Sequence, residues 1–245
     1  MTTPGTVAVV IPYYQHQEFI DATLQSVAQQ TQSVEKVIVV DDGSPTPFRS
    51  SLSHSTLNLE VFRQPHVGLA CARNSGFEIA DTEYVIPLDS DDLLCTDFVE
   101  VMLSVAQETK APIVYCDIET FGAEAAVYRH PPYDFVRLCR GNYIVATSMI
   151  RSSTFQAVRQ SNGHGYDQAL SELGGYEDHL FYLEAGALGM YGVHVPQVLF
   201  RYRRRQGSML QQARSRFPTI REYMRRKMMA VYSIDIGELT EPGEP

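Results

Sequence analysis

The sequence predicts an α/β fold in which helices flank a doubly wound, mostly parallel sheet. Two observations support this prediction. In the first 120 residues, short aliphatic runs alternate with segments whose apolar residues recur at helical spacing. The runs are apolar throughout, which is typical of strands buried on both faces of a parallel sheet. Beyond this point the alternation weakens, so we expect a less regular second half.

The first three elements are predicted to form a strand–helix–strand unit. Residues 7–11 form a continuous apolar run that Pro12 closes, and residues 36–40 contain a second such run. Between them, residues 17–30 carry apolar side chains at helical spacing. A helix that connects two parallel strands crosses over in the right-handed sense, and we expect that sense here.

The remaining elements are predicted in the same way. In the first half we expect a short strand, a helix, a strand, a helix and a strand, at residues 59–62, 69–80, 83–88, 97–109 and 113–116. In the second half we expect a strand, a glycine-rich loop, a helix and a strand, at residues 143–149, 163–175, 177–187 and 193–203.

The composition is that of a globular protein with a sizeable core. The chain has 245 residues, 44% of them hydrophobic, which suits one large α/β domain or a domain with a short appendage. The apolar runs are too short for a signal peptide or a membrane span, so we expect a cytoplasmic protein. The four cysteines include no C-x-x-C pair, which argues for free, buried thiols.

The charge is unevenly distributed along the chain. The net charge is −9, yet residues 201–227 contain ten Arg or Lys and one acidic residue, so this segment carries +9 and the rest −18. The overall acidity argues against a nucleic-acid partner. The basic C-terminal segment must therefore have a role of its own.

Two acidic clusters directly follow predicted strands. Asp41 and Asp42 follow the second strand, and residues 89–92 contain three carboxylates after the fourth strand. Such clusters also occur in ordinary turns and at helix N-termini. Here, however, both lie at the carboxyl ends of parallel strands, where ligands bind. An Asp-x-Asp pair at such a place supplies the hard oxygen ligands that Mg²⁺ and Mn²⁺ prefer beside a nucleotide diphosphate.

Six segments match the motifs of a known family in their order and spacing. They are V-A-V-V-I-P-Y-Y at 7–14, E-K-V-I-V-V-D-D-G-S at 35–44, G-L-A-C-A-R-N-S-G at 68–76, Y-V-I-P-L-D-S-D-D at 84–92, G-G-Y-E-D-H-L at 174–180 and F-R-Y-R-R-R-Q-G-S-M at 200–209. On these motifs, over roughly residues 5–215, the chain resembles a family 2 glycosyltransferase of the GT-A fold. The resemblance implies a metal-dependent, inverting transfer of a sugar from a nucleotide-diphosphate sugar, with UDP as the expected nucleotide. The acceptor would be a hydroxyl of a saccharide or lipid-linked molecule.

The resemblance also implies which residues bind the donor. Tyr14 and Asp42 would hold the nucleobase, although Asp42 could instead form an Asx-turn before Gly43. Asp41 would serve the ribose or cap its loop. Arg73 would approach the nucleotide or form a surface salt bridge. The full set is Pro12, Tyr14, Asp41, Asp42, Arg73, Asp89, Ser90, Arg203 and Arg205.

The metal ligands and the catalytic base are implied in the same way. Asp91 would bind Mn²⁺ or Mg²⁺ across the two phosphates, Asp89 would contact ribose or metal, and Asp92 would be a second ligand or a helix cap. Glu177 and Asp178 match the family's Glu-Asp pair, whose Asp is the usual base; the alternative is plain helix capping. A carboxylate at a helix N-terminus is stabilised in its charged form, so we expect Asp178 to be ionised at pH 7.

The basic segment falls where the family closes a loop over the diphosphate. Arg203 and Arg205 alternate along an extended stretch, so they share a face from which either could reach the phosphates. Many family members carry a His at this turn that can help to bind the metal. This chain carries Arg205 there, which leaves open whether the last contact is to metal or to phosphate. His194 is predicted to be a strand-surface residue.

The predicted organisation is one GT-A domain with two short appendages. The domain spans residues 1–215, with a nucleotide-binding half at 1–120 and an acceptor and catalytic-base half at 121–215. A basic amphipathic helix at 216–236 and a disordered tail at 237–245 follow. The helix would pack on the domain, form homo-oligomers or, through residues 216–232, touch the inner face of an anionic membrane.

The acceptor side and the exact activity are less well determined. The acceptor is expected to contact some of residues 143–151, Tyr128, Tyr133, Tyr166, Asp167 and Tyr176. A nucleotidyltransferase would carry a Gly-rich loop after the first strand, and residues 12–16 are not such a loop. A catalytically inactive relative that binds nucleotide-sugars, or serves as a partner subunit, would have lost the aspartates or the Glu-Asp pair. This chain retains both.

Overall fold

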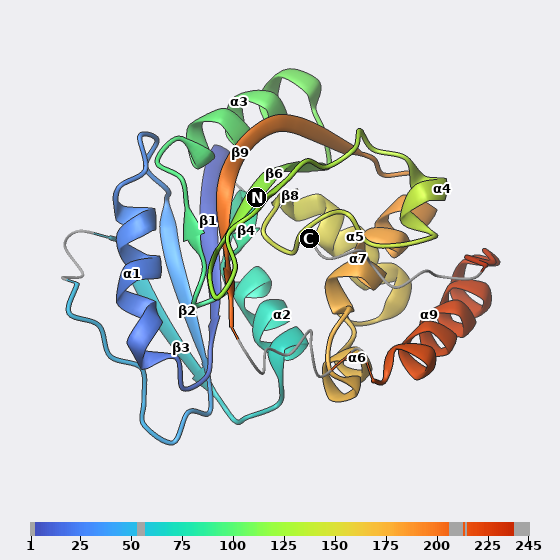
Figure 1. Cartoon of the computed structure of the whole chain (residues 1–245), viewed down its shortest axis with the longest axis horizontal. Helices are drawn as coiled ribbons and strands as arrows, with labels where there is room; N and C mark the ends of the chain where they lie inside the picture. Colours follow the sequence, from blue (N-terminus) through green and yellow to red (C-terminus); the bar gives the residue numbers. More distant parts are fainter. Residues whose placement is uncertain (1–2, 53–56, 206–212, 214, 238–245) are drawn as a thin grey trace.

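A computed structural model describes residues 3–52, 57–205, 213 and 215–237. Within these residues a nine-stranded sheet forms the centre, with helices on both faces (Figure 1). The strands are β1 (Thr3–Tyr13), β2 (Lys36–Asp42), β3 (Leu59–Gln64), β4 (Thr82–Pro87), β5 (Leu93–Leu94), β6 (Ile113–Gly122), β7 (Val127–Tyr128), β8 (Met149–Arg151) and β9 (Gly192–Arg204). The helices are α1 (Gln17–Ala28), α2 (Leu69–Ile79), α3 (Phe98–Thr109), α4 (Phe135–Leu138), α5 (Ser152–Asn162), α6 (Gln168–Leu173), α7 (Glu177–Ala187) and α9 (Phe217–Tyr232).

The sheet is mostly parallel in its first half. The strand order is β3-β2-β1-β4-β8-β6-β9-β5, with β7 paired to β6. β1 pairs in parallel with β2 and β4, and β2 pairs in parallel with β3. β8 interrupts this pattern because it runs antiparallel to both β4 and β6, whereas the long strand β9 is again parallel to β6. The predicted α/β class and parallel first half are confirmed.

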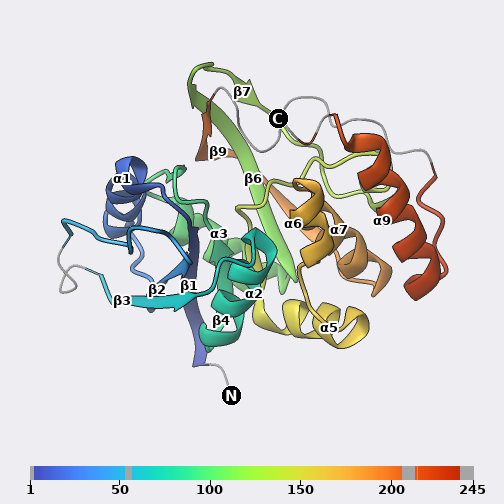
Figure 2. The same cartoon turned by 90° about the horizontal axis from the view of Figure 1, so that it is seen from below.

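Two hydrophobic cores lie on the two faces of the sheet. Ala8 and Val10 of β1 belong to the core that includes residues of α2, α5, α7 and α9. Val7, Val9 and Ile11 belong to the core that includes residues of α1 and α3. Figure 2 shows α1 across the sheet from α5, α6 and α7. Because successive side chains of a strand point to opposite faces, both faces must be apolar, which explains the continuous apolar runs.

The close approach of α2 to β1 requires a glycine. A Cβ at Gly76 would lie 2.2 Å from Cγ1 of Val10, so a larger residue would push the helix away from the strand. Arg73 lies one turn earlier on the same helix and is buried. The packing of α2 thus holds an arginine close to the carboxyl ends of the strands.

The second half differs from the prediction at several places. The predicted strand at 143–149 is mostly irregular, and only Met149–Arg151 pairs in the sheet, as β8. The predicted loop at 163–175 contains α6, whose N-cap Asp167 accepts from the N–H of Ala169. The elements β5, β7, α4 and α5 have no counterpart in the prediction. Short elements such as these depend on their tertiary partners, because their own apolar pattern is brief.

The C-terminal helix α9 packs on α6 and α7. Its buried face consists of Phe217, Ile220, Met224 and Met228. On the polar side, Lys227 pairs with the buried N-cap of α6. Packing on the domain is therefore observed, whereas self-association and membrane contact stay predictions.

No helix among the described residues is long and apolar enough to cross a membrane. Residues 238–245 of the predicted tail, and residues 206–212 and 214 of the basic segment, lie outside the described residues.

Candidate active site

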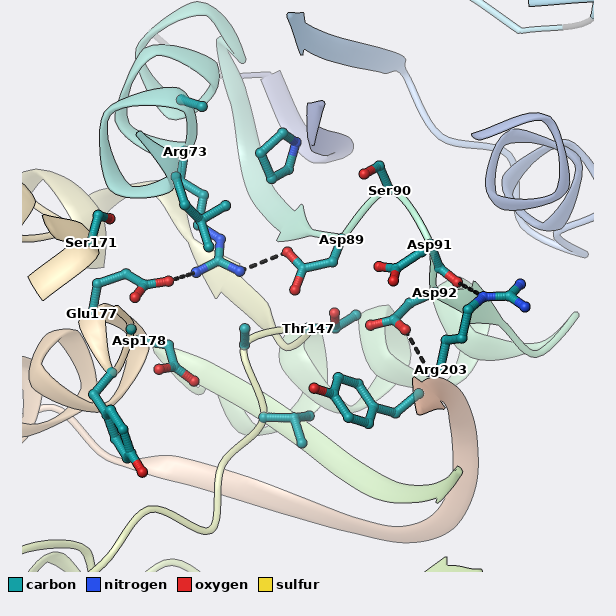
Figure 3. Close-up of a pocket in the computed structure, with 18 of the residues that line it drawn as sticks. Arg73, Asp89, Ser90, Asp91, Asp92, Thr147, Ser171, Glu177, Asp178 and Arg203 are labelled. Carbon is teal, nitrogen blue, oxygen red and sulfur yellow. Dashed lines mark hydrogen bonds and ion pairs between the residues drawn. The ribbon is translucent and has the colours of Figure 1, made fainter. Parts of the chain in front are cut away.

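A cavity of about 550 Å³ opens at the carboxyl ends of β1, β2 and β4. This volume is in the range of pockets that bury a small organic ligand. Of the predicted site residues, twelve line it and Asp41 does not. The twelve are Pro12, Tyr14, Asp42, Arg73, Asp89, Ser90, Asp91, Asp92, Glu177, Asp178, Arg203 and Arg205. Figure 3 shows how α2, the loop after β4 and the start of α7 present several of these side chains to one space.

An aromatic pair forms part of the cavity wall. The rings of Tyr14 and His66 stack with centroids 4.1 Å apart and an interplanar angle of 16°. Both residues line the cavity, and Tyr14 keeps 37% of its surface exposed. A planar ligand such as a nucleobase can therefore reach this pair.

The Asp42 carboxylate is saturated by its own loop. Its Oδ1 accepts from Gln64 Nε2 at 2.8 Å and from the N–H of Val67 at 3.1 Å. Its Oδ2 accepts from the N–H of Gly68 and contacts His66 Nδ1, each at 2.8 Å. A carboxylate offers about four lone-pair positions. An imide N–H could therefore bind Asp42 only by replacing one of its side-chain partners, Gln64 or His66.

Asp41 caps the loop that follows β2. It is buried and accepts from the N–H groups of Ser44 and Phe48 at 2.9 and 3.1 Å. The neighbouring Gly43 has a φ of +71°, and a Cβ there would lie 2.5 Å from the backbone nitrogen of His66. The geometry thus favours loop capping over ribose contact for Asp41, since its oxygens are directed to backbone donors outside the cavity.

Arg73 links the two acidic regions of the cavity. Its guanidinium contacts Glu177 Oε1 at 2.5 Å and Asp89 Oδ1 at 2.7 Å (Figure 3). Arg73 thus forms salt bridges, as the second of its two predicted roles requires. They are buried and not at the surface, because only 2% of Arg73 is exposed. A buried cation needs such partners to offset its lost hydration. Arg73 therefore joins the loop after β4 to the start of α7.

Asp178 is oriented by a residue that no motif predicts. Its Oδ2 accepts from Nδ2 of Asn142 at 3.2 Å. The Oδ1 of Asn142 accepts in turn from the N–H of Ile144 at 3.1 Å, which determines the orientation of the amide group. The carboxylate of Asp178 is thus held by a donor from the residue just before the predicted strand at 143–149.

The pKa of Asp178 differs from the expectation. Burial raises this pKa to about 7, the charge of Glu177 adds to the rise, and Arg73 opposes it. The loss of hydration therefore outweighs the favourable field of the helix N-terminus, and the expectation of a fully ionised carboxylate at pH 7 is too simple. A pKa near neutrality suits a group that must take up a proton at about that pH.

The loop after β4 is held by hydrogen bonds from three directions. Thr23 of α1 donates to the carbonyl oxygens of Ser90 and Asp92. His16 Nδ1 lies 2.7 Å from Ser90 Oγ. Arg203 of β9 donates its backbone N–H to Asp92 Oδ1 at 2.7 Å. Burial, and then the neighbouring aspartates, raise the pKa of Asp92 well above its usual value. Asp92 therefore belongs more to the support of the loop than to the cavity surface.

Two carboxylates of this loop are balanced by arginines. Asp89 contacts Arg73, and Asp91 Oδ2 lies 2.8 Å from NH2 of Arg205. Figure 3 also shows Arg203 beside Asp91, to whose carbonyl oxygen it donates. Among the described residues, no group of three or more His, Cys, Asp or Glu side chains could hold a metal ion. The donor set therefore fits a divalent cation only together with oxygens of a ligand, as is usual for Mg²⁺ at nucleotide sites.

The predicted acceptor residues fall into two groups. Tyr143 and Tyr176 line the cavity, together with the adjoining residues 144–147. Tyr166, by contrast, is 1% exposed and belongs to the core. The irregular segment that carries Tyr143 thus lines the cavity, and the adjoining Asn142 contacts Asp178.

The cavity residues that no motif predicts include His16, His66 and Asn142. His16 and His66 each lie two residues from a motif residue, so the loops flanking the motifs carry a weak signal for them. Asn142 has no such signal. For His194 the prediction of a strand-surface residue is wrong. Its side chain is largely buried and lies 2.7 Å from Asp117.

Sequence comparisons identify the family. The model of Glycosyl transferase family 2 matches residues 8–165. Glycosyltransferase GlyG of Streptococcus pneumoniae is 24% identical over 229 residues, which cover 83% of this chain and 72% of that protein. The uncharacterized glycosyltransferase EpsJ of Bacillus subtilis is 25% identical over 54% of this chain and 39% of its own length. A cholesterol galactosyltransferase of Borreliella burgdorferi is 29% identical over 44% of this chain and 31% of its own length. The chain thus spans well under half of the last two relatives.

Structural comparison agrees with the sequence comparison. The structure of S. aureus TarS 1–349 in complex with UDP superposes with a TM-score of 0.70 over 92% of this chain and 66% of that one, at 16% identity. The complex of the same fragment with UDP-GlcNAc gives a TM-score of 0.69 at 18% identity, over 92% of this chain and 67% of that one. At such identities the likeness establishes the fold, which is the predicted GT-A fold. Because the family model matches more than half of this chain, the chain belongs to glycosyl transferase family 2 and is a glycosyltransferase.

Proposed function

We propose that this glycosyltransferase is metal-dependent and inverting, and that it moves a sugar from a UDP-sugar to a hydroxyl of a saccharide or lipid-linked acceptor. One observation carries the proposal. Asp178, with a pKa of about 7, lines the same cavity as the arginine-paired carboxylates Asp89 and Asp91. Asp178 can thus take up a proton, while Asp89 and Asp91 could hold a cation that neutralises the departing diphosphate.

The choice of UDP has two kinds of support. The Tyr14–His66 pair offers an aromatic surface for the base, and Asp42 could accept an imide N–H there in exchange for its contact with Gln64 or His66. The similar TarS structures are described as complexes with UDP and with UDP-GlcNAc. GDP and TDP are the competing nucleotides, and a direct titration separates the three.

In the proposed reaction, ionised Asp178 accepts the proton of the acceptor hydroxyl. The hydroxyl oxygen bonds to the anomeric carbon as the bond from that carbon to the diphosphate oxygen breaks, and the bonding electrons leave with the diphosphate. Attack from the face opposite the leaving group inverts the configuration. Asn142 keeps the Asp178 carboxylate oriented during this step. Arg203 and Arg205 lie beside the loop after β4, where they can neutralise the developing charge.

A bound Mn²⁺ or Mg²⁺ would supply further neutralisation of the leaving diphosphate. Asp91 and Asp89 are the proposed ligands, because both line the cavity and both are balanced by arginine side chains. Asp92 is a poorer candidate. It would have to give up the backbone N–H of Arg203, which it accepts while buried.

The proposal is tested first by calorimetric titration of UDP, GDP and TDP, each with and without Mn²⁺. We expect tight binding of UDP only when Mn²⁺ is present. Hydrolysis of UDP-GlcNAc, UDP-glucose and UDP-galactose then tests the chemistry, because water can replace an unknown acceptor. The variant Asp178→Asn should bind UDP normally and release sugar far more slowly than the wild type.

Three results would contradict separate parts of the proposal. Tight UDP binding that ignores Mn²⁺ would remove the metal dependence. Turnover by Asp178→Asn at the wild-type rate would remove the base. Tight UDP binding by a wild-type protein that releases no sugar from any donor, with or without added saccharides, would favour the inactive nucleotide-sugar-binding relative.

A further inference from the structure

A guanidinium lies between two side chains that both have the character of metal ligands. NH2 of Arg205 is 2.8 Å from Asp91 Oδ2 and 3.2 Å from Nε2 of His16. His16 comes from the loop between β1 and α1, and Asp91 from the loop after β4. The tertiary structure thus brings a carboxylate oxygen and an imidazole nitrogen to the same cation.

The hydrogen bonds determine which nitrogen of His16 carries a proton. A guanidinium can only donate, so the Nε2 that faces Arg205 must be unprotonated and present its lone pair. The proton of the neutral ring is then on Nδ1, which donates to Ser90 Oγ at 2.7 Å. Metal-binding histidines show the same arrangement, in which one nitrogen faces the cation and the other N–H is held by an oxygen.

We propose that His16 Nε2 and Asp91 Oδ2 form the protein's half of the divalent-cation site, and that the cation replaces the Arg205 guanidinium there when the nucleotide binds. This inference rests on the metal dependence proposed above. It adds a nitrogen ligand that no motif predicts, and it assigns Arg205 to a contact that the cation displaces. The remaining ligands would be diphosphate oxygens and water.

The chemistry of the pair selects among cations. Mg²⁺ takes almost only oxygen ligands, whereas first-row transition metals also accept imidazole. A site with one nitrogen and one carboxylate oxygen therefore favours Mn²⁺ over Mg²⁺. Loss of the imidazole should reduce this preference as well as the affinity.

The surroundings of Arg205 allow its guanidinium to move away from Asp91. The Arg205 side chain is 36% exposed, and its guanidinium lies 5.0 Å from the ring centroid of Phe19, which also supports Arg203 at 4.7 Å. The Asp91 side chain is only 13% exposed and needs a cationic partner, and a divalent ion that replaces the guanidinium would supply one. Once released, Arg205 remains beside the phosphates that arrive with the cation.

The decisive measurement is pulsed electron paramagnetic resonance of Mn²⁺ bound with saturating UDP. Coordination by His16 should give a ¹⁴N hyperfine coupling in addition to the ³¹P coupling of the diphosphate. The variant His16→Asn keeps an N–H near the position of Nδ1 but has no atom in place of Nε2. It should lose the ¹⁴N coupling and raise the Kd of Mn²⁺ by about tenfold or more.

Arg205 is tested by its own matched pair. Arg205→Met removes the competing cation and should lower the Kd of Mn²⁺ several-fold. Arg204→Met removes the same charge from the neighbouring residue, whose Nε lies 3.7 Å from Glu124 instead, and should leave this Kd unchanged.

Each part of the inference can fail separately. Mn²⁺ that binds with ³¹P coupling but without ¹⁴N coupling would overturn the role of His16 and leave the proposed metal dependence intact. Weaker Mn²⁺ binding by Arg205→Met would overturn the displacement, because the arginine would then assist the cation. A wild-type protein that binds UDP tightly and no Mn²⁺ would contradict the proposed metal dependence and this inference together.

Discussion

The acidic clusters at the end of β2 and after β4 both lie at the carboxyl ends of parallel strands but have different partners. Asp41 and Asp42 accept mainly from backbone N–H groups and side chains near their own loop, and the only arginine contact of Asp41 among the described residues is a longer one, 3.6 Å to Arg63. Asp89 and Asp91 are paired instead with arginine side chains. A carboxylate held by backbone donors is part of the loop's structure, whereas one balanced by a side-chain cation can exchange that cation. The partners of these aspartates therefore predict that Asp41 supports its loop, whereas Asp89 and Asp91 can exchange their arginine partners for a ligand.

The largest loss of activity should come from substitution of Asp178, the cavity-lining carboxylate whose pKa is raised. Asp178→Asn removes the proposed proton acceptor, and the rate of sugar release should fall about 10²–10⁴-fold with unchanged UDP affinity. Steady-state kinetics with a UDP-sugar measures this loss, and calorimetry measures the affinity.

Stability provides the control for that variant. The pKa of Asp178 is about 7 in the folded protein and near 3.9 in an unfolded chain, so ionisation of this group lowers the stability as the pH rises from about 4 through 7. Asp178→Asn should therefore be more stable than wild type at pH 8. A variant that melts earlier at that pH would show that its lost activity reflects unfolding.

Substitution of Asp41, which caps the loop after β2, should lower the stability of the protein and leave ligand binding unchanged. Asp41→Ala leaves the backbone N–H groups of Ser44 and Phe48 unpaired in a buried place. We expect a loss of about 3 kcal/mol in the free energy of unfolding, measured by urea denaturation. Asp91→Ala removes the same carboxyl from the second cluster and should cost far less stability. Equal losses in the two variants would contradict the comparison of the clusters.

Asp91 should affect ligand binding with little change in stability. Asp91→Asn keeps the size of the side chain and removes its charge, so the affinity for UDP in the presence of Mn²⁺ should fall about 10–100-fold. UDP affinity without Mn²⁺ should change little. If calorimetry gives the wild-type affinity with Mn²⁺ present, Asp91 belongs with Asp41 as a structural residue.

The smallest effect should come from the residue that orients Asp178. Asn142→Ala removes a donor that stabilises the ionised carboxylate, so the pKa of Asp178 should rise above about 7. The rate of sugar release requires the ionised form and should fall tenfold per pH unit below that pKa. The acidic limb of the pH–rate profile should therefore move to higher pH, with a rate loss of only severalfold above it. A profile identical to that of the wild type would limit Asn142 to a packing role.

Much of the fold is readable in the sequence because the parallel strands are buried on both faces. Residues 7–11 and 37–40 had to be apolar at every position, and such runs are visible without knowledge of their partners. The second half was harder, because β8 has three residues and pairs only through neighbours from distant segments. The helix α6 was hidden inside a glycine-rich stretch, where its cap Asp167 resembles an ordinary loop residue.

By itself, the sequence determined the fold class, the family and the list of candidate residues, since motif order and strand ends depend only on local pattern. Only the tertiary structure decided which groups each candidate contacts. Asn142 meets Asp178 across 36 residues, and His16 meets Arg205 across 189. The pKa of Asp178 is raised by burial, which no short segment encodes. Contacts and desolvation arise from segments that are distant in sequence, and for that reason they cannot be read from a motif.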